Sequence, residues 1–202
     1  MPTSRAASGG LPVGAARASV DPPNAVDESE PSMPLNQALL GKEYPPVRYE
    51  VGREKLREFA ESVGETDPVY HDEEAARAAG HPDIPAVPTF PIVLSRRVGQ
   101  KVYEDPDLGL DYSRVVHGEQ EFTYHRPIFA GDRLLAAGRV AAVQVRGRHE
   151  LLAIETVVTT EEGEPVCSAT VTLIARGTAP AATGPAATPE PGTAPGPAGG
   201  SA

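Results

Sequence analysis

Hydrophobic positions in the first half of the globular part of this chain follow the spacing of helices. Residues 53–64 carry one apolar stripe, and residues 72–80 form a shorter segment that opens with acidic residues. Residues 88–105 are apolar nearly all round over their first half, which predicts a buried helix. Pro88 and Pro91 fit only the first turn of that helix, so we expect it to begin at Pro88.

The period of the pattern changes to two after residue 113, as is typical of strands. Strands are expected at residues 47–52, 114–128, 132–147, 149–162 and 165–177. The turns "VRGRHE" and "EEGEP" join the strands at 132–147, 149–162 and 165–177 into an antiparallel meander, and "FAGDRL" turns the chain between residues 114–128 and 132–147. A curved antiparallel sheet wrapped around one long central helix buries both apolar surfaces, so the pattern predicts an α+β fold.

The two ends of the chain differ in composition from its middle. Residues 1–34 and 178–202 are rich in proline, glycine and alanine and poor in large apolar side chains, which predicts disorder. Residues 35–177 form the one expected domain. Met33 stands where ordinary globular sequence begins, and one hypothesis is that translation starts there rather than at Met1; N-terminal sequencing of the native protein tests it.

Charge and composition exclude several classes of protein. A formal net charge of −10 argues against a general nucleic-acid binder, which needs a basic face. The sequence contains no apolar run long enough for a membrane span and no evident secretory signal. Its single cysteine, Cys167, has no partner for an internal disulfide, which fits the cytoplasm.

The stretch with the clearest candidate catalytic residues is "GETDPVYHDEEAARAAG", residues 64–80. Glu65, Asp67 and His71 stand close together there, and a carboxylate beside a histidine is a common acid/base pair. The same residues have a second interpretation. Asp-Pro steps often start turns, and His71 then becomes a polar residue at the start of a helix.

Four segments, taken in order, resemble the hot-dog domain of the MaoC-like (R)-specific hydratase and dehydratase family, N-terminal type. They are "EFAESVGETDPVYHDEEAARAAGH", "PAVPTF", "VVHGEQEFTYHRPIFAGDRL" and "TEEGEPVCSATVTLIAR". Their order and spacing cover nearly the whole expected domain. The pattern is most similar to an actinobacterial family and to the A subunits of heterodimeric (3R)-hydroxyacyl-ACP dehydratases.

The resemblance implies a catalytic motif of Gly-Asp-x-Asn-Pro-aliphatic-His, from which this chain departs. Glu65 stands at the Asp position, Asp67 at the Asn position and Tyr70 at the His position, so that His71 comes one residue late. Catalytic members also open the central helix with a His-Gly-like step whose N–H can face the thioester oxygen. Here Pro88 stands at that step and has no N–H to donate, which leaves Thr89 or Phe90 as the remaining donors.

The resemblance therefore implies a subunit of a (3R)-hydroxyacyl-thioester dehydratase in fatty-acyl metabolism. Its substrate is an acyl-ACP or acyl-CoA, and a second MaoC-like hot-dog chain supplies the Asp/His pair. The expected substrate-facing residues are Tyr70, Pro88, Thr89 and Phe90. No resident cofactor and no metal are expected.

Other arrangements stay open at this point. The chain forms a homodimer or acts as a self-sufficient hydratase that uses His71 with Glu65 or Asp67, or it is a non-enzymatic module that binds acyl thioesters. His117 and His125, eight residues apart on one expected strand, are candidates to share a face. Their spacing does not match a zinc motif, so a structural or tunnel-lining role is the expectation.

Overall fold

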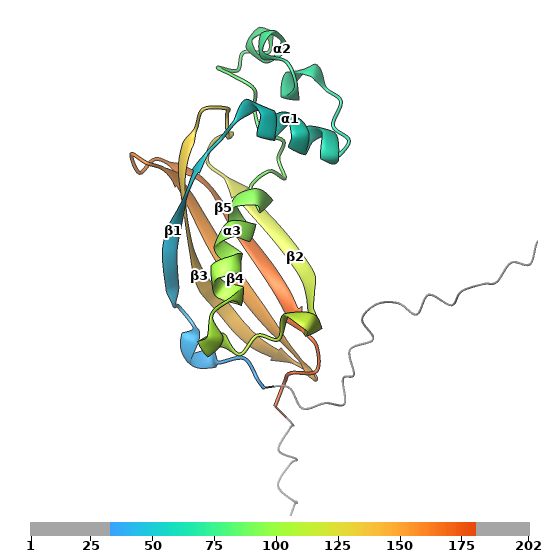
Figure 1. Cartoon of the computed structure of the whole chain (residues 1–202), viewed down its shortest axis with the longest axis vertical. Coiled ribbons are helices and arrows are strands. Elements are labelled where there is room, and N and C mark those ends of the chain that lie inside the picture. The colour runs from blue at the N-terminus through green and yellow to red at the C-terminus, as the bar shows by residue number, and fades with distance from the viewer. Residues whose placement is uncertain (1–32, 181–202) are drawn as a thin grey trace, which may run out of the picture.

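Five antiparallel strands form one curved sheet in the computed structural model, which describes residues 33–180 (Figure 1). Their order across the sheet is β1-β3-β4-β5-β2. The strands are β1 (Glu43–Glu50), β2 (Val115–Tyr124), β3 (Arg133–Arg146), β4 (His149–Thr160) and β5 (Pro165–Ala175). The α+β arrangement predicted from the sequence is confirmed. Most of the terminal segments predicted to be disordered lies outside the described residues, so those predictions and the Met33 start stay predictions.

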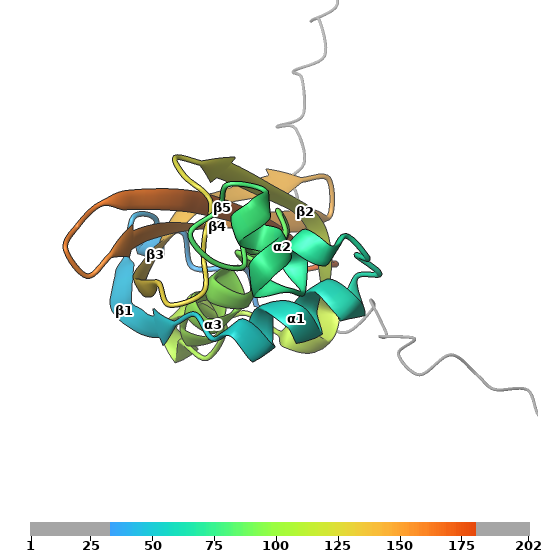
Figure 2. The ribbon, with the colours of Figure 1, turned by 90° about the horizontal axis from the view of Figure 1, so that it is seen from above.

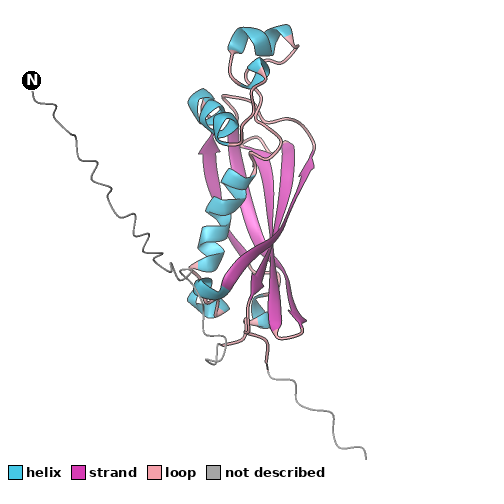
Figure 3. Ribbon diagram, turned by 90° about the vertical axis from the view of Figure 1, so that its right-hand side faces the viewer, coloured by secondary structure: helices cyan, strands magenta, loops and turns pink. Residues whose placement is uncertain are grey.

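The long helix α3 (Ile92–Tyr103) lies lengthwise against the concave face of the sheet (Figure 3). Leu94, Val98 and Val102 recur every four residues on one stripe of α3 and are fully buried. The helix comes so close to β3 that a Cβ atom placed on Gly138 would lie 2.0 Å from Val98 Cγ1. A glycine at this position of β3 therefore allows the sheet to wrap the helix.

The central helix begins four residues later than the sequence predicts. Regular helical hydrogen bonding starts where Ser95 N donates to the carbonyl of Pro91, and Phe90 N donates instead to Val87 across a turn. Two prolines in four residues remove two donors, so the chain makes a turn before it coils. Residues 88–91 are thus a loop at the mouth of the helix.

Two shorter helices cover the end of the sheet at which α3 begins (Figure 2). Helix α1 (Arg53–Ser62) buries Leu56 and Ala60. The chain then turns through Gly64, whose φ of 76° is a conformation that favours glycine. Helix α2 (Glu73–Ala78) follows after a loop, with Asp72 as its N-cap. The loop between these helices holds the candidate catalytic residues.

The two edge strands of the sheet differ in how they are protected. Strand β1 starts earlier than predicted and runs through Pro45 and Pro46, with a register shift between Tyr44 and Val47. Prolines discourage a further strand from pairing at that edge because they have no N–H to donate. Strand β2 contains no proline and, among residues 33–180, pairs only with β5. In the part of the chain that the structure describes, no helix is long and apolar enough to cross a membrane.

Candidate active site

The carboxylates of the α1–α2 loop bind backbone groups of the loop itself. Glu65 Oε1 accepts hydrogen bonds from the amides of Thr66 and Asp67, at 2.8 and 2.9 Å. Asp67 Oδ1 accepts from the amide of Val69 at 3.0 Å and so caps the short helix Pro68–Tyr70. Both acids therefore close turns, as the second interpretation of the sequence expects.

His71 does lie beside Glu65, but it contacts the backbone rather than the carboxylate. His71 Nε2 is 2.8 Å from the carbonyl oxygen of Glu65. A carbonyl oxygen can only accept, so this bond requires the proton on Nε2. The carbonyl of His71 in turn accepts from Arg57 Nε at 2.7 Å, which ties the loop to α1. The structure thus brings the predicted residues together in an arrangement that stabilises a loop.

Tyr70 and Pro88, two of the predicted substrate-facing residues, line one cavity of about 360 Å³. The other lining residues are His81, Pro85, Ala86, Tyr124, His125, Arg126 and Pro127. His71 is not among them. Tyr124 Oη donates a hydrogen bond to the carbonyl of Pro88 at 3.0 Å, and burial raises the pKa of this phenol. We call this cavity the loop cavity. Its tyrosines, histidines and prolines give it both polar and apolar walls.

Pro88 leaves the backbone N–H groups of Thr89 and Phe90 as candidate donors to a thioester oxygen, and these two residues differ in position. Phe90 is fully buried, with its ring edge-on to Phe59 at 5.4 Å between centroids, and its N–H already donates to Val87. It is a core residue in this structure. Thr89 is exposed at the turn.

Two ion pairs hold the chain around the loop cavity. Arg126 donates to both carboxylate oxygens of Asp132, at 2.8 and 3.1 Å, and fixes the turn from β2 to β3. Arg53 makes a similar two-pronged contact with Asp83, in the segment between α2 and α3. The hydrogen bonds from Arg53 lower the pKa of Asp83 to about 2.

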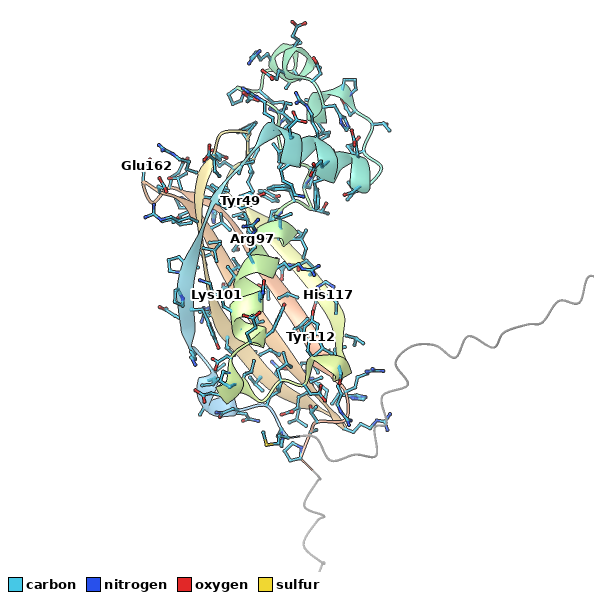
Figure 4. The ribbon with its side chains drawn as sticks, in the orientation of Figure 1. Tyr49, Arg97, Lys101, Tyr112, His117 and Glu162 are labelled. Atoms are coloured by element: carbon cyan, nitrogen blue, oxygen red, sulfur yellow. The ribbon has the colours of Figure 1, made fainter. Side chains whose placement is uncertain are left out.

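A second cavity of about 340 Å³ lies between α3 and strand β2, and we call it the helix–strand cavity. Its lining residues are Ile92, Ser95, Arg96, Tyr103, Tyr112, Val115, His117, Gln120, Val171 and Leu173. Figure 4 shows Tyr112 and His117 on the β2 side of α3, opposite the side on which Lys101 lies. Tyr103 and Tyr112 lie with ring centroids 5.4 Å apart.

A β-bulge in β2 decides which side chains enter the helix–strand cavity. The register shifts between His117 and Glu119, which leaves Gly118 without a place in the ladder. Because of this extra residue, His117 and Gln120 both line the cavity although they are three apart. His125 lines the loop cavity instead, so the two histidines do not share a site. Sequence reasoning missed this, and Gly118 within a strand pattern was the available signal.

Metal binding finds no support in this geometry. Among residues 33–180, no three His, Cys, Asp or Glu side chains are grouped so that they could hold a metal ion. Cys167 is buried in β5, and burial raises the pKa of its thiol to about 11.

Comparison with known proteins identifies the family of this hot-dog-like arrangement. The family model for the FAS1-like dehydratase domain region matches residues 38–169. The chain belongs to this dehydratase family. A UPF0336 protein of Saccharopolyspora erythraea is 55% identical over 148 residues, which is 73% of this chain and 95% of that protein. A UPF0336 protein of Streptomyces coelicolor is 51% identical over 145 residues, 71% of this chain and 97% of that protein.

Solved structures of dehydratases share the fold. One chain of a C-terminally truncated HadBC complex, a (3R)-hydroxyacyl-ACP dehydratase of Mycobacterium tuberculosis, is 31% identical. It superposes with a TM-score of 0.62 over 67% of this chain and 96% of that chain. A MaoC-like dehydratase is 28% identical with a TM-score of 0.63, over 69% of this chain and 42% of that chain. The predicted MaoC-like hot-dog fold is therefore confirmed.

Proposed function

We propose that this chain is a subunit of a (3R)-hydroxyacyl-thioester dehydratase or enoyl hydratase, in which it shapes the acyl tunnel. A partner hot-dog chain supplies the Asp/His pair that moves protons. The substrate class is an acyl chain carried as a thioester on ACP or CoA, and the single cysteine suits a cytoplasmic setting. The observation that carries the proposal is the hydrogen bonding of Glu65 and His71 to the backbone of their own loop.

Dehydration requires a base that removes a proton next to the thioester carbonyl and an acid that assists loss of the β-hydroxyl group. Both groups must reach the substrate through hydrogen-bonding atoms that are free to change partners. Here the Glu65 carboxylate accepts hydrogen bonds from two backbone amides, and His71 Nε2 donates its hydrogen bond to a backbone carbonyl. Tyr70 lines the loop cavity at the position that the family motif gives to histidine. Tyr70 carries a phenol and lacks the imidazole that most often serves as the base.

The helix–strand cavity supports a role in holding the acyl chain. Its volume of about 340 Å³ lies within the usual range of small-molecule sites, about 300–1,000 Å³. Aliphatic side chains such as Ile92, Val171 and Leu173 form part of its wall. Apolar walls favour a hydrocarbon chain because burial of its surface is stabilising, at about 25 cal/mol per Å².

The need for a partner is supported by the free edge of β2 and by the chemistry that the loop lacks. An edge strand offers a row of unpaired backbone donors and acceptors to another strand, and β2, unlike β1, contains no proline. The 31% identical HadBC chain belongs to a complex named for two different subunits. A second hot-dog chain at the edge of β2 would supply the acid/base pair and close the tunnel.

Co-expression tests the proposal. The chain is purified alone and together with a candidate MaoC-like chain that carries the complete Asp/His motif, and hydration of crotonyl-CoA and crotonyl-ACP is measured. We expect activity from the pair and none above background from this chain alone. Full activity from this chain alone would instead support a self-sufficient hydratase. Acyl-thioester binding without activity in any combination would support a non-enzymatic module.

A further inference from the structure

Strand β2 carries its acidic residues on the convex face of the sheet, in the middle of the free edge. Glu119 lies opposite Thr172 of β5 and Glu121 lies opposite Thr170. Both glutamates are exposed, whereas the concave-face residue Gln120 between them is partly buried. Val116 is also on the edge and is 40% exposed. The free edge therefore combines an exposed apolar residue with two carboxylates.

Two copies of this chain would bring these carboxylates together if they paired through β2. Gly118 has no place in the ladder, so the nine paired residues of β2 between Val115 and Tyr124 have Gln120 as their midpoint. In an antiparallel pair that overlaps over the whole strand, residues at equal distances from the midpoint face each other. Glu119 of one copy would therefore lie opposite Glu121 of the other, and Glu121 opposite Glu119. Facing Cβ atoms are about 4.5–5.5 Å apart, and like charges at that distance oppose pairing.

We propose that the edge of β2 selects a different hot-dog chain whose own edge strand is basic. Lysine or arginine side chains of that partner lie opposite Glu119 and Glu121. The same carboxylates exclude a second copy of this chain. This inference rests on the proposed function, since it takes β2 as the joint between two hot-dog chains, and it names the chemistry of the partner's edge.

A charge-swap experiment with the chain itself provides the basic partner. The double variant Glu119→Lys/Glu121→Lys is mixed with the wild-type chain, and association is measured by sedimentation velocity over a range of concentrations. We expect the wild type and the variant to associate weakly when each is alone. We expect their mixture to form a dimer about tenfold tighter or more, because two facing pairs change from repulsive to attractive. Added salt weakens that dimer.

The control variant Glu61→Lys/Glu162→Lys makes the same change of charge away from β2, on α1 and in the β4–β5 turn, where Figure 4 marks Glu162. Its mixture with the wild type should associate no more tightly than the wild type alone. A wild-type chain that already forms a tight dimer, or a Lys variant whose mixture behaves like the control, would overturn the inference. Neither readout uses catalysis, so failure of the dehydratase assay remains a separate result.

Discussion

Replacing His71 by alanine tests whether this histidine has a structural or a catalytic role. The side chain is half-buried, and its one described hydrogen bond joins Nε2 to the carbonyl of Glu65 at 2.8 Å. Loss of such a bond costs about 0.5–1.5 kcal/mol of the free energy of unfolding. For a domain of this size that corresponds to a fall of about 2–4 °C in Tm per kcal/mol. The variant should therefore melt a few degrees lower.

The rate of the assembled dehydratase should change by less than about threefold in the same variant. A histidine that acts as general base typically contributes about 100- to 10,000-fold, so the two roles predict results that differ widely. The assay is loss of the enoyl-thioester absorbance during hydration of crotonyl-CoA by the co-purified pair of chains. If turnover instead slows by about 100-fold or more while the pair still assembles, the reasoning is refuted and His71 is catalytic.

His149→Ala is the matched control for this experiment. His149 Nδ1 accepts a hydrogen bond from the amide of Gly177 at 3.1 Å, so its loss also removes one imidazole–backbone contact. It lies at the start of β4, in another part of the fold from the loop. Both variants should lose similar stability and keep similar activity. A loss of activity confined to the His71 variant would contradict a purely structural role.

Three further substitutions test the packing, the electrostatics and the tunnel. Gly138→Ala should lower the free energy of unfolding in urea by about 1–3 kcal/mol, because its Cβ would clash with Val98; Gly52→Ala, where nothing lies within 4 Å, should cost much less. Asp83→Asn should lower Tm at neutral pH. The pKa of Asp83 is about 2 in the folded chain, below its unfolded value of about 3.9, so the stabilisation is present above about pH 4. The difference in Tm from the wild type should shrink as the pH falls from about 4 toward 2, and a constant difference would contradict the assignment. Val171→Phe should lower kcat/KM of the assembled enzyme about tenfold for long acyl chains and leave kcat/KM for crotonyl thioesters unchanged. An equal loss of kcat/KM for both chain lengths would argue against the tunnel.

Much of the fold could be predicted from the sequence because the hydrophobic period is strong where the core is large. The stripe of α1 and the alternation of β3, β4 and β5 each reflect burial against one surface. The errors occur where other forces decide. The start of α3 is delayed by Pro88 and Pro91, and β1 continues through two prolines because an edge strand tolerates missing donors.

The candidate site was less predictable than the fold because its geometry changes when the chain shifts by a single residue. The sequence placed Glu65 and His71 near each other, but the choice between carboxylate and carbonyl as the partner of Nε2 depends on the fold of the turn. The bulge at Gly118, which brings His117 and Gln120 into one cavity, arises from pairing with β5. Neither the hydrogen-bond partner of His71 nor the bulge at Gly118 can be predicted from hydrophobic periodicity, because each depends on a shift of only one residue.

Under the proposed function, the loop and the strand edge together explain how this chain keeps a dehydratase fold while a partner chain supplies the acid/base pair. Loop cavity and helix–strand cavity are held by the core and by ion pairs such as Arg126–Asp132, which do not depend on the identity of the acid/base residues. In that proposal, the departures from the family motif at Glu65 and Tyr70 remove proton transfer while the walls of both cavities persist. Once catalysis depends on another chain, selection acts on pairing with that chain. In this proposal, carboxylates at Glu119 and Glu121 that oppose self-association favour the productive partner, because every homodimer would contain two loops that depart from the catalytic motif.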